Sequence, residues 1–225
     1  MSHHLNAVRA AFSAQAADFS RPGLTVTDPH HLGWMLASLE LDPAWSVLDV
    51  AAGTGLLSLA IAPQVRQVLA LDATPAMIRE GTRAVAAAGP TRITFVNGLA
   101  ENLPAAAGAF DLVACRFAIH HFKDPRRPVS DMLRVCRAGG RIALVDLIAS
   151  DDTRLAQSYN HFERLRDPSH TRAFAANRTG SVARRLWAIA HTNDSAQYPR
   201  RRGALAWANK NRRTQQRVNP CGAAG

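Results

Sequence analysis

The stretch Ser46–Ser58 constrains the fold of this chain more than any other segment. The apolar run over residues 47–50 predicts a buried strand. Residues 51–53 are Ala, Ala and Gly, which let the backbone turn sharply, and Gly55 opens a helix with an apolar pattern. A strand, a glycine turn and a helix N-terminus form a nucleotide-type site, because small residues let a ligand approach the main chain and the first helical N–H groups face it.

Two residues of this stretch indicate which ligand the turn takes. Ser58 stands where the dinucleotide fingerprint requires a third glycine. Asp49 lies inside the strand, and its carboxylate would repel a pyrophosphate but suits a ligand with an ammonium group and no phosphate. S-adenosylmethionine is such a ligand.

On residues 47–55, Val-Leu-Asp-Val-Ala-Ala-Gly-Thr-Gly, the chain resembles the class I (Rossmann-like) methyltransferases that use S-adenosylmethionine. Within this family it is most similar to the group that includes the ubiquinone/menaquinone-biosynthesis and small-molecule methyltransferases. The resemblance covers roughly Ala7 to Phe174. It implies methyl transfer to a small-molecule acceptor, in a doubly wound, mostly parallel α/β sheet with helices on both faces.

The later segments repeat a helix–turn–strand order. This order favours a parallel α/β sheet as the economical architecture. A glycine turn over residues 137–141 matches the family's late turn, which positions the last of these strands. The further strands are expected at residues 67–72, 92–96, 110–115 and 142–146.

The predicted cofactor site follows the carboxyl ends of these strands. Asp72 lies 17 positions beyond Gly55, close to where a doubly wound fold places the acid that binds ribose hydroxyls; the alternative is an ordinary strand-end acid. Leu99 stands where the family commonly has Asp, so adenine is expected against main-chain groups near Ala100 and Glu101. The residues predicted to hold the cofactor are Asp49, Ala51, Gly53, Gly55, Asp72, Ala73, Ala100, Glu101, Cys115 and Arg116.

The segment Cys115–His121 follows the fourth strand, so it should border the reacting methyl group. His120, or else His121, is the predicted base that removes a proton from the acceptor. The alternative is that the pair caps a helix or hydrogen-bonds to the loop. No metal is expected, because adjacent histidines point in different directions and the three cysteines contain no C-x-x-C motif.

Four segments are expected along the chain. Residues 1–45 form a helical cap, which either helps to build the substrate pocket or only covers the sheet. Residues 46–150 form the Rossmann-like core, and residues 151–174 an amphipathic helix of the acceptor pocket. Residues 175–225 form an atypical tail without strand periodicity, so the C-terminal strands of the fold are expected to be missing or degenerate.

The tail holds nearly all of the net charge of +10. Residues 1–174 carry 17 Lys and Arg against 16 Asp and Glu, whereas residues 175–225 carry 10 against 1. Three interpretations compete: a disordered basic arm that binds RNA or anionic membrane, a divergent helical lid, and an out-of-frame continuation of a GC-rich gene. We favour the third, which would leave the fifth strand as an exposed sheet edge.

Other function classes are less well supported. An NAD(P)-dependent oxidoreductase is disfavoured by the missing third glycine and by Asp49. The alternative from outside the enzymes is a non-catalytic cofactor- or nucleic-acid-binding protein with a degenerate C-terminus, and nucleic-acid binding would depend on the basic tail alone. No apolar run approaches a membrane span and the N-terminus lacks a signal-peptide pattern, which predicts a cytoplasmic protein without a membrane partner.

Overall fold

The computed structural model of this chain describes residues 3–89, 91–175 and 190–191. Helices and strands alternate through most of the described chain. In order, the elements are α1 (His3–Gln15), η1 (Thr25–Thr27), α2 (Pro29–Leu39), β1 (Ser46–Val50), α3 (Leu56–Ile61), η2 (Ala62–Gln64), β2 (Gln67–Asp72), α4 (Pro75–Ala88), β3 (Ile93–Asn97), β4 (Phe110–Arg116), η3 (Ile119–His121), α5 (Arg126–Val135), β5 (Cys136–Val145), β6 (Ile148–Ala149), α6 (Thr153–Arg166), β7 (Phe174–Ala175) and β8 (Ala190–His191).

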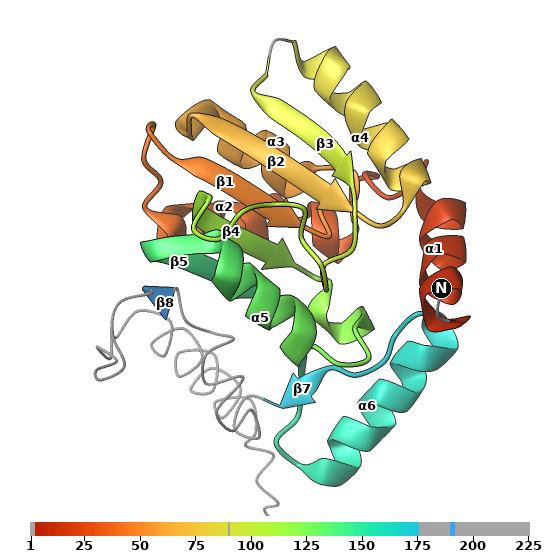
Figure 1. Cartoon of the computed structure of the whole chain (residues 1–225). Helices are drawn as coiled ribbons and strands as arrows, with labels where there is room; N and C mark the ends of the chain where they lie inside the picture. Colours follow the sequence, from red (N-terminus) through yellow and green to blue (C-terminus); the bar gives the residue numbers. More distant parts are fainter. Residues whose placement is uncertain (1–2, 90, 176–189, 192–225) are drawn as a thin grey trace, which may run out of the picture. The chain divides into compact units, whose positions relative to one another are not determined.

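The main sheet has β1 near its centre. Its strands hydrogen-bond in the order β3-β2-β1-β4-β5-β8, and the first five are parallel. Val47 of β1 pairs with Val68 of β2 on one side and with Leu112 of β4 on the other. The strand order reverses between β1 and β4, and ligands of doubly wound folds bind at such a reversal. The predicted architecture is confirmed, and the carboxyl ends of the parallel strands point toward α1 (Figure 1).

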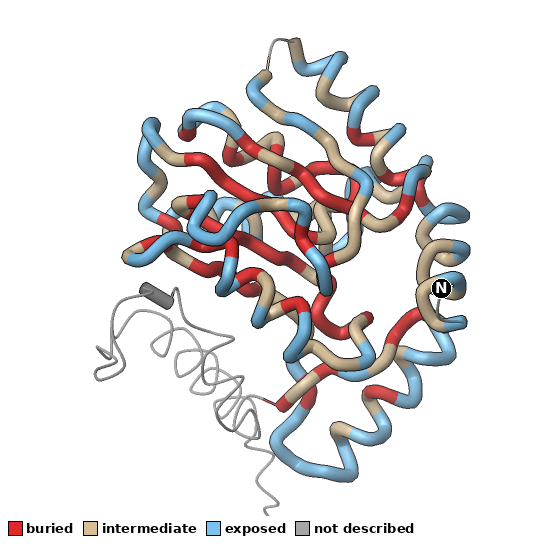
Figure 2. The backbone as a smooth tube through the Cα atoms, viewed as in Figure 1, coloured by how far each residue is buried: buried red, intermediate tan, exposed pale blue. Residues whose placement is uncertain are grey.

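Both faces of the sheet are covered, as the alternation of strand side chains requires. On one face Leu48 and Val50 belong to a buried cluster with Met132 of α5. On the other face Val47 belongs to a cluster with Ile61 of α3 and residues of α2. The central strands are accordingly buried along their length (Figure 2).

The glycine turn predicted at residues 137–141 lies inside β5 and not before it. Phe110 of β4 pairs with Cys136, and two residues later Leu112 pairs with Arg141, so β5 makes an irregular excursion between these partners. Gly139 has a φ of +73° there. A Cβ on Gly140 would lie 2.9 Å from the Asp111 carbonyl oxygen, so the close approach of the two strands requires glycine at this position.

The C-terminal part of the sheet is short. The sequence pattern predicts no strand beyond residue 174, whereas β8 pairs antiparallel with β5 at Arg141 and Ile142, so the β5 edge is covered at these two residues. A separate two-stranded parallel sheet joins β6 to β7. Apart from residues 175 and 190–191, the predictions made for residues 175–225 concern residues outside those described.

Helix α6 connects β6 to β7 through a segment that matters for the site. Asp152 caps the helix, since its carboxylate accepts hydrogen bonds from the N–H groups of Arg154 and Leu155. The expected start at residue 151 is therefore two residues early. None of the helices in the described ranges has both the length and the apolar character of a membrane span.

Candidate functional site

The turn between β1 and α3 has the backbone conformation that its small residues predict. Ala51, Gly53 and Gly55 all have positive φ, at 55°, 58° and 78°. A Cβ on Gly55 would lie 2.7 Å from the Phe95 ring, and one on Gly53 would lie 3.4 Å from the Phe19 ring. Glycine is therefore required at residue 55 for space as well as for conformation, and the turn holds main-chain groups open to a ligand.

Asp72, at the end of β2, holds the turn in place. One carboxylate oxygen accepts the Gly53 N–H at 2.8 Å, and the other accepts the Thr74 N–H at 2.7 Å. Burial raises the pKa of Asp72, and these main-chain hydrogen bonds oppose the rise. Each oxygen retains a second lone pair that can accept from a ligand hydroxyl.

Asp49 is a second buried carboxylate, one strand away. Its side chain is almost fully buried and accepts a hydrogen bond from the Ser58 hydroxyl at 2.7 Å. Burial raises the pKa of Asp49 to about 7, against the opposing effects of Ser58 and of Arg116. The serine that replaces the third fingerprint glycine therefore serves as a hydrogen-bond donor to the strand carboxylate.

A cavity of about 400 Å³ lies over this turn, within the size range of small-molecule sites. Most of the residues predicted to hold the cofactor lie in its wall. Those that line the cavity are Asp49, Ala51, Gly53, Asp72, Ala73, Ala100, Glu101 and Arg116, and Gly55 and Cys115 are not in the wall.

Gly55 and Cys115 lie behind the cavity wall. Gly55 is the residue before the first turn of α3, against Phe95. Cys115 is fully buried in β4, and burial raises the pKa of its thiol well above the ordinary value. Its sulfur is therefore a neutral core group.

The two histidines have different surroundings. His121 lines the cavity, and its ring packs edge-on against Phe12 with the centroids 4.9 Å apart. His120 is not in the wall; its Nδ1 hydrogen-bonds to the Asp146 carboxylate, which also accepts the His120 N–H at 2.9 Å. The structure thus places His121 against the cavity, although the sequence analysis favoured His120.

The N-terminal segment closes the cavity, so it does more than cover the sheet. His4 of α1 donates through Nε2 to the His121 carbonyl at 2.8 Å, and Arg9 donates to the Ala73 carbonyl at 2.8 Å. Arg116 donates to the Val26 carbonyl in η1. The residues of this segment in the wall are His4, Leu5, Val8, Phe12, Phe19 and Val26. Helical spacing indicated α1, but only these long-range contacts show which of its residues face the cavity.

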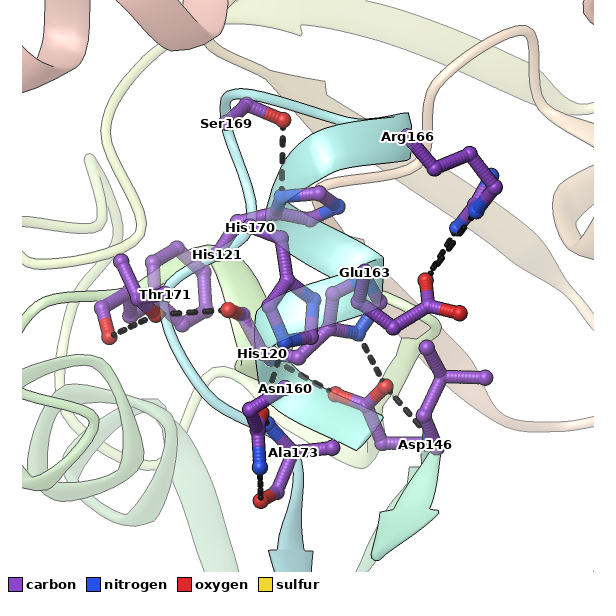
Figure 3. A network of polar contacts seen from close by, with 12 residues as sticks. His120, His121, Asp146, Asn160, Glu163, Arg166, Ser169, His170, Thr171 and Ala173 are labelled. Atoms are coloured by element: carbon purple, nitrogen blue, oxygen red, sulfur yellow. Dashed lines mark hydrogen bonds and ion pairs between the residues drawn. The ribbon is translucent and has the colours of Figure 1, made fainter. Parts of the chain in front are cut away.

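No residue of the 151–174 segment is among those that line the cavity, and the acceptor-pocket role expected for its helix stays a prediction. The segment instead hydrogen-bonds to the turn that carries His120 and His121, as Figure 3 shows. Thr171, for example, donates through its N–H to the His120 carbonyl at 2.8 Å. Among the described residues, no group of three or more His, Cys, Asp and Glu side chains is arranged to hold a metal ion.

Comparison with known proteins agrees with this geometry. A family model described as "Methyltransferase domain" matches residues 47–140. The chain is 37% identical over 156 residues to the uncharacterized methyltransferase YcgJ of Bacillus subtilis, covering 69% of this chain and 62% of that protein. It is 31% identical over 131 residues to a demethylmenaquinone methyltransferase of Clavibacter sepedonicus, covering 58% and 53%. The chain thus spans less than two thirds of the length of either curated relative.

Solved structures give the same result. The crystal structure of YcgJ superposes with a TM-score of 0.65 at 36% identity, covering 68% of this chain and 65% of that one. The Bacillus halodurans protein BH2331, a candidate methyltransferase, superposes with a TM-score of 0.65 at 32% identity, covering 69% and 67%. The chain belongs to the class I S-adenosylmethionine-dependent methyltransferases.

The cofactor of this methyltransferase family is S-adenosylmethionine, and the cavity fits it. Asp49 and Asp72 put two buried carboxylates beside the turn, which suits a cationic ligand with ribose hydroxyls and opposes a pyrophosphate. At Gly53 a Cβ would meet Phe19, so glycine keeps open the space beside the main chain. Ala100, buried near the start of the loop after β3, adds apolar surface.

Proposed function

We propose that this methyltransferase transfers a methyl group from S-adenosylmethionine to a small-molecule acceptor inside the cavity. The observation that carries the proposal is the wall of one cavity. The residues that line it include Gly53 of the turn, the two acidic residues Asp49 and Asp72, and His121. A cofactor site and a proton acceptor thus share one enclosed space.

The part of the wall that holds Asp49 and Asp72 is the proposed cofactor subsite. Asp72 would accept from ribose hydroxyls, Asp49 would attract the positive charge, and main-chain groups at Ala100 and Glu101 would border the adenine. When bound, S-adenosylmethionine supplies a methyl group that its sulfonium has already activated. The work of the chain is therefore to align the acceptor, exclude water and take up a proton where the acceptor must lose one.

His121 is the proposed base. Burial, with a contribution from nearby His120, lowers the pKa of His121 to about 4, so the imidazole is neutral at physiological pH. A neutral imidazole has one ring nitrogen with a free lone pair. The proton of an acceptor O–H or N–H would pass to this nitrogen and then leave to solvent as the site opens.

The proposed acceptor is apolar with an ionisable hydroxyl or amine. Apolar side chains from α1, the loop after it and the loop after β4 make up the wall around His121, including Leu5, Val8, Phe12, Phe117 and Phe122. One relative is named a demethylmenaquinone methyltransferase. Reduced demethylmenaquinone has this chemistry and is the first acceptor to test.

Thermal unfolding of the full chain tests the cofactor subsite. We compare S-adenosylhomocysteine, NAD and no ligand. A ligand at about 100 times its Kd adds about 2.7 kcal/mol, which raises the midpoint of a chain this size by roughly 5–10 °C. We expect this shift with S-adenosylhomocysteine only. A cooperative transition without a shift would mean that the cavity does not bind the cofactor, and a shift with NAD alone would favour an oxidoreductase.

A further inference from the structure

The segment after α6 folds back onto the turn that carries the two histidines (Figure 3). The Thr171 hydroxyl lies 2.6 Å from the His120 carbonyl oxygen and 3.0 Å from that of Phe122, and the two carbonyls share its single proton. The N–H groups of Thr171 and Arg172 donate to the same His120 carbonyl. These bonds attach residues 167–173 to η3, although about 50 residues separate the two segments in sequence.

One set of these contacts ends on the imidazole of His121. The Ser169 hydroxyl lies 2.5 Å from a carboxylate oxygen of Asp167 and 3.0 Å from Nδ1 of His121. The Ser169 N–H also donates to Asp167, at 2.9 Å. Ser169 has no exposed surface, so water does not compete for these bonds.

The direction of each hydrogen bond in this chain follows from the groups involved. A serine hydroxyl has one proton, and a carboxylate can only accept, so the Ser169 proton is committed to Asp167. The contact with His121 must then be an Nδ1–H donating to Ser169 Oγ. The imidazole is consequently the Nδ1–H tautomer, and its free lone pair is on Nε2.

Nε2 of His121 is available to a ligand. No described residue hydrogen-bonds to it, and it is not among the fully buried side-chain atoms without a partner, so it borders open space. The open space next to His121 is the cavity. We propose that Asp167 and Ser169 are positioning residues, which hold His121 in the Nδ1–H tautomer and so present Nε2 as the proton acceptor. This inference rests on the proposed function.

Asp167 also carries the negative charge that would stabilise a protonated His121. Burial raises the pKa of Asp167, but hydrogen bonds from Ser169 and the nearby His121 outweigh this effect and lower it overall. Asp167 is therefore ionised when Nε2 takes a proton. The imidazolium so formed keeps its Nδ1–H bond to Ser169, and the carboxylate behind Ser169 stabilises the new positive charge.

The experiment measures the tautomer of His121 directly, by imidazole ¹⁵N NMR of the full chain labelled at histidine. His121→Asn assigns the signal by removing it. In the wild-type protein at neutral pH we expect a protonated Nδ1 and an unprotonated Nε2. Ser169→Ala should lose this preference, because nothing then accepts the Nδ1–H, whereas Ser169→Thr should keep it, because the hydroxyl is retained.

Thr171→Val is the matched control. It removes a side-chain hydrogen bond between the same two segments without touching the His121 ring. If the segment only fastens the turn, Thr171→Val and Ser169→Ala should both lower the unfolding midpoint and leave the tautomer unchanged. That result, or an Nε2–H tautomer in the wild-type protein, would overturn the inference.

Two further readouts separate this inference from the proposed function. Stabilisation by S-adenosylhomocysteine should be the same in the wild type and all four variants; its absence in the wild type would count against the cofactor subsite and not against Ser169. With reduced demethylmenaquinone as probe acceptor, Ser169→Ala should lower kcat by about tenfold or more at unchanged KM for S-adenosylmethionine, because the base loses its orientation. Thr171→Val should stay within about twofold of wild type.

Discussion

At the scale of single residues, the pattern indicated the chemistry of Asp49 but not its environment. An acid inside an apolar strand predicts a carboxylate beside the turn, because strand and turn are adjacent in sequence. The bond from Ser58 could not be predicted, because it depends on how α3 packs against β1. The same limit applies to His120 and His121. Adjacent residues look alike in sequence, and only packing against Phe12 and Asp146 distinguishes them.

The raised pKa of Asp49 predicts a pH dependence of stability. The folded protein keeps this proton up to a pH of about 7, whereas the unfolded chain loses it near the ordinary pKa of an Asp side chain, 3.8. Between these two pH values the folded state therefore binds more protons than the unfolded state. The free energy of unfolding should fall as pH rises from about 4 to about 7. The Asn side chain of Asp49→Asn stays neutral and can still accept the Ser58 hydrogen bond. The variant should therefore be more stable than wild type at pH 8 and as stable as wild type at pH 4.

Urea unfolding at several pH values measures this difference. Asp42→Asn, in an exposed loop, controls for the loss of a negative charge. Calorimetry should show weaker binding of S-adenosylhomocysteine to Asp49→Asn, because the ammonium group loses an attractive charge. Parallel stability curves for wild type and Asp49→Asn would show that Asp49 is ionised in the folded protein across this range.

At the scale of elements, local pattern predicted β2 to the residue and the start of α6 to within two residues. The excursion in β5 escaped prediction, because it depends on the approach of Asp111 from β4. Another long-range feature is the Phe95 ring of β3, which packs against Gly55 at the start of α3 and against Gly81 in the middle of α4. This ring joins the turn to both helices, and no periodic pattern signals such a three-way contact.

Two glycines inside helices allow a matched test of this contact. Gly33 in α2 has no atom within 4 Å of the position a Cβ would take, whereas at Gly81 a Cβ would lie 2.5 Å from Phe95 and 3.0 Å from the Thr54 carbonyl oxygen. Gly33→Ala should stabilise the protein by about 0.5–1 kcal/mol through helix propensity. Gly81→Ala should destabilise it by about 1–3 kcal/mol through overpacking.

Urea unfolding gives both values, and S-adenosylhomocysteine affinity gives a second readout. Gly81→Ala should weaken binding, because a displaced Phe95 pushes on the turn at Gly55. If both alanine variants stabilised the protein equally, Phe95 would have room to move and the proposed link between α4 and the turn would be absent.

At the scale of the whole molecule, the order of repeated segments was enough to predict the fold, because parallel strands need helical connections and reverse their order once. The attachment of residues 167–173 to η3 was not predictable. It consists of single hydrogen bonds between distant segments, which impose no spacing on the sequence. The predicted role of residues 151–174 in the acceptor pocket was inferred from resemblance and stays a prediction, since none of these residues lines the cavity.

The distribution of charge over the whole chain gives the last prediction. Every described residue that lines the cavity lies between His4 and Arg127, whereas residues 194–225 carry seven Lys and Arg against one Asp. A chain ending at Asn193, the boundary of the first compact unit, should therefore keep the full stabilisation by S-adenosylhomocysteine. It should also elute from heparin at lower salt, because contacts with a polyanion depend on the number of cations and are screened by salt.

The two measurements on this shortened chain answer separate questions. Loss of S-adenosylhomocysteine binding with a cooperative unfolding transition would mean that residues 194–225 contribute to the cofactor site, which the cavity wall gives no reason to expect. Unchanged elution from heparin would mean that the polyanion binds the nearly neutral part of the chain, and a nucleic-acid role for the tail would then lose its physical basis. Retained cofactor binding with earlier elution would separate cofactor binding from basic charge within one chain, as the proposed function predicts.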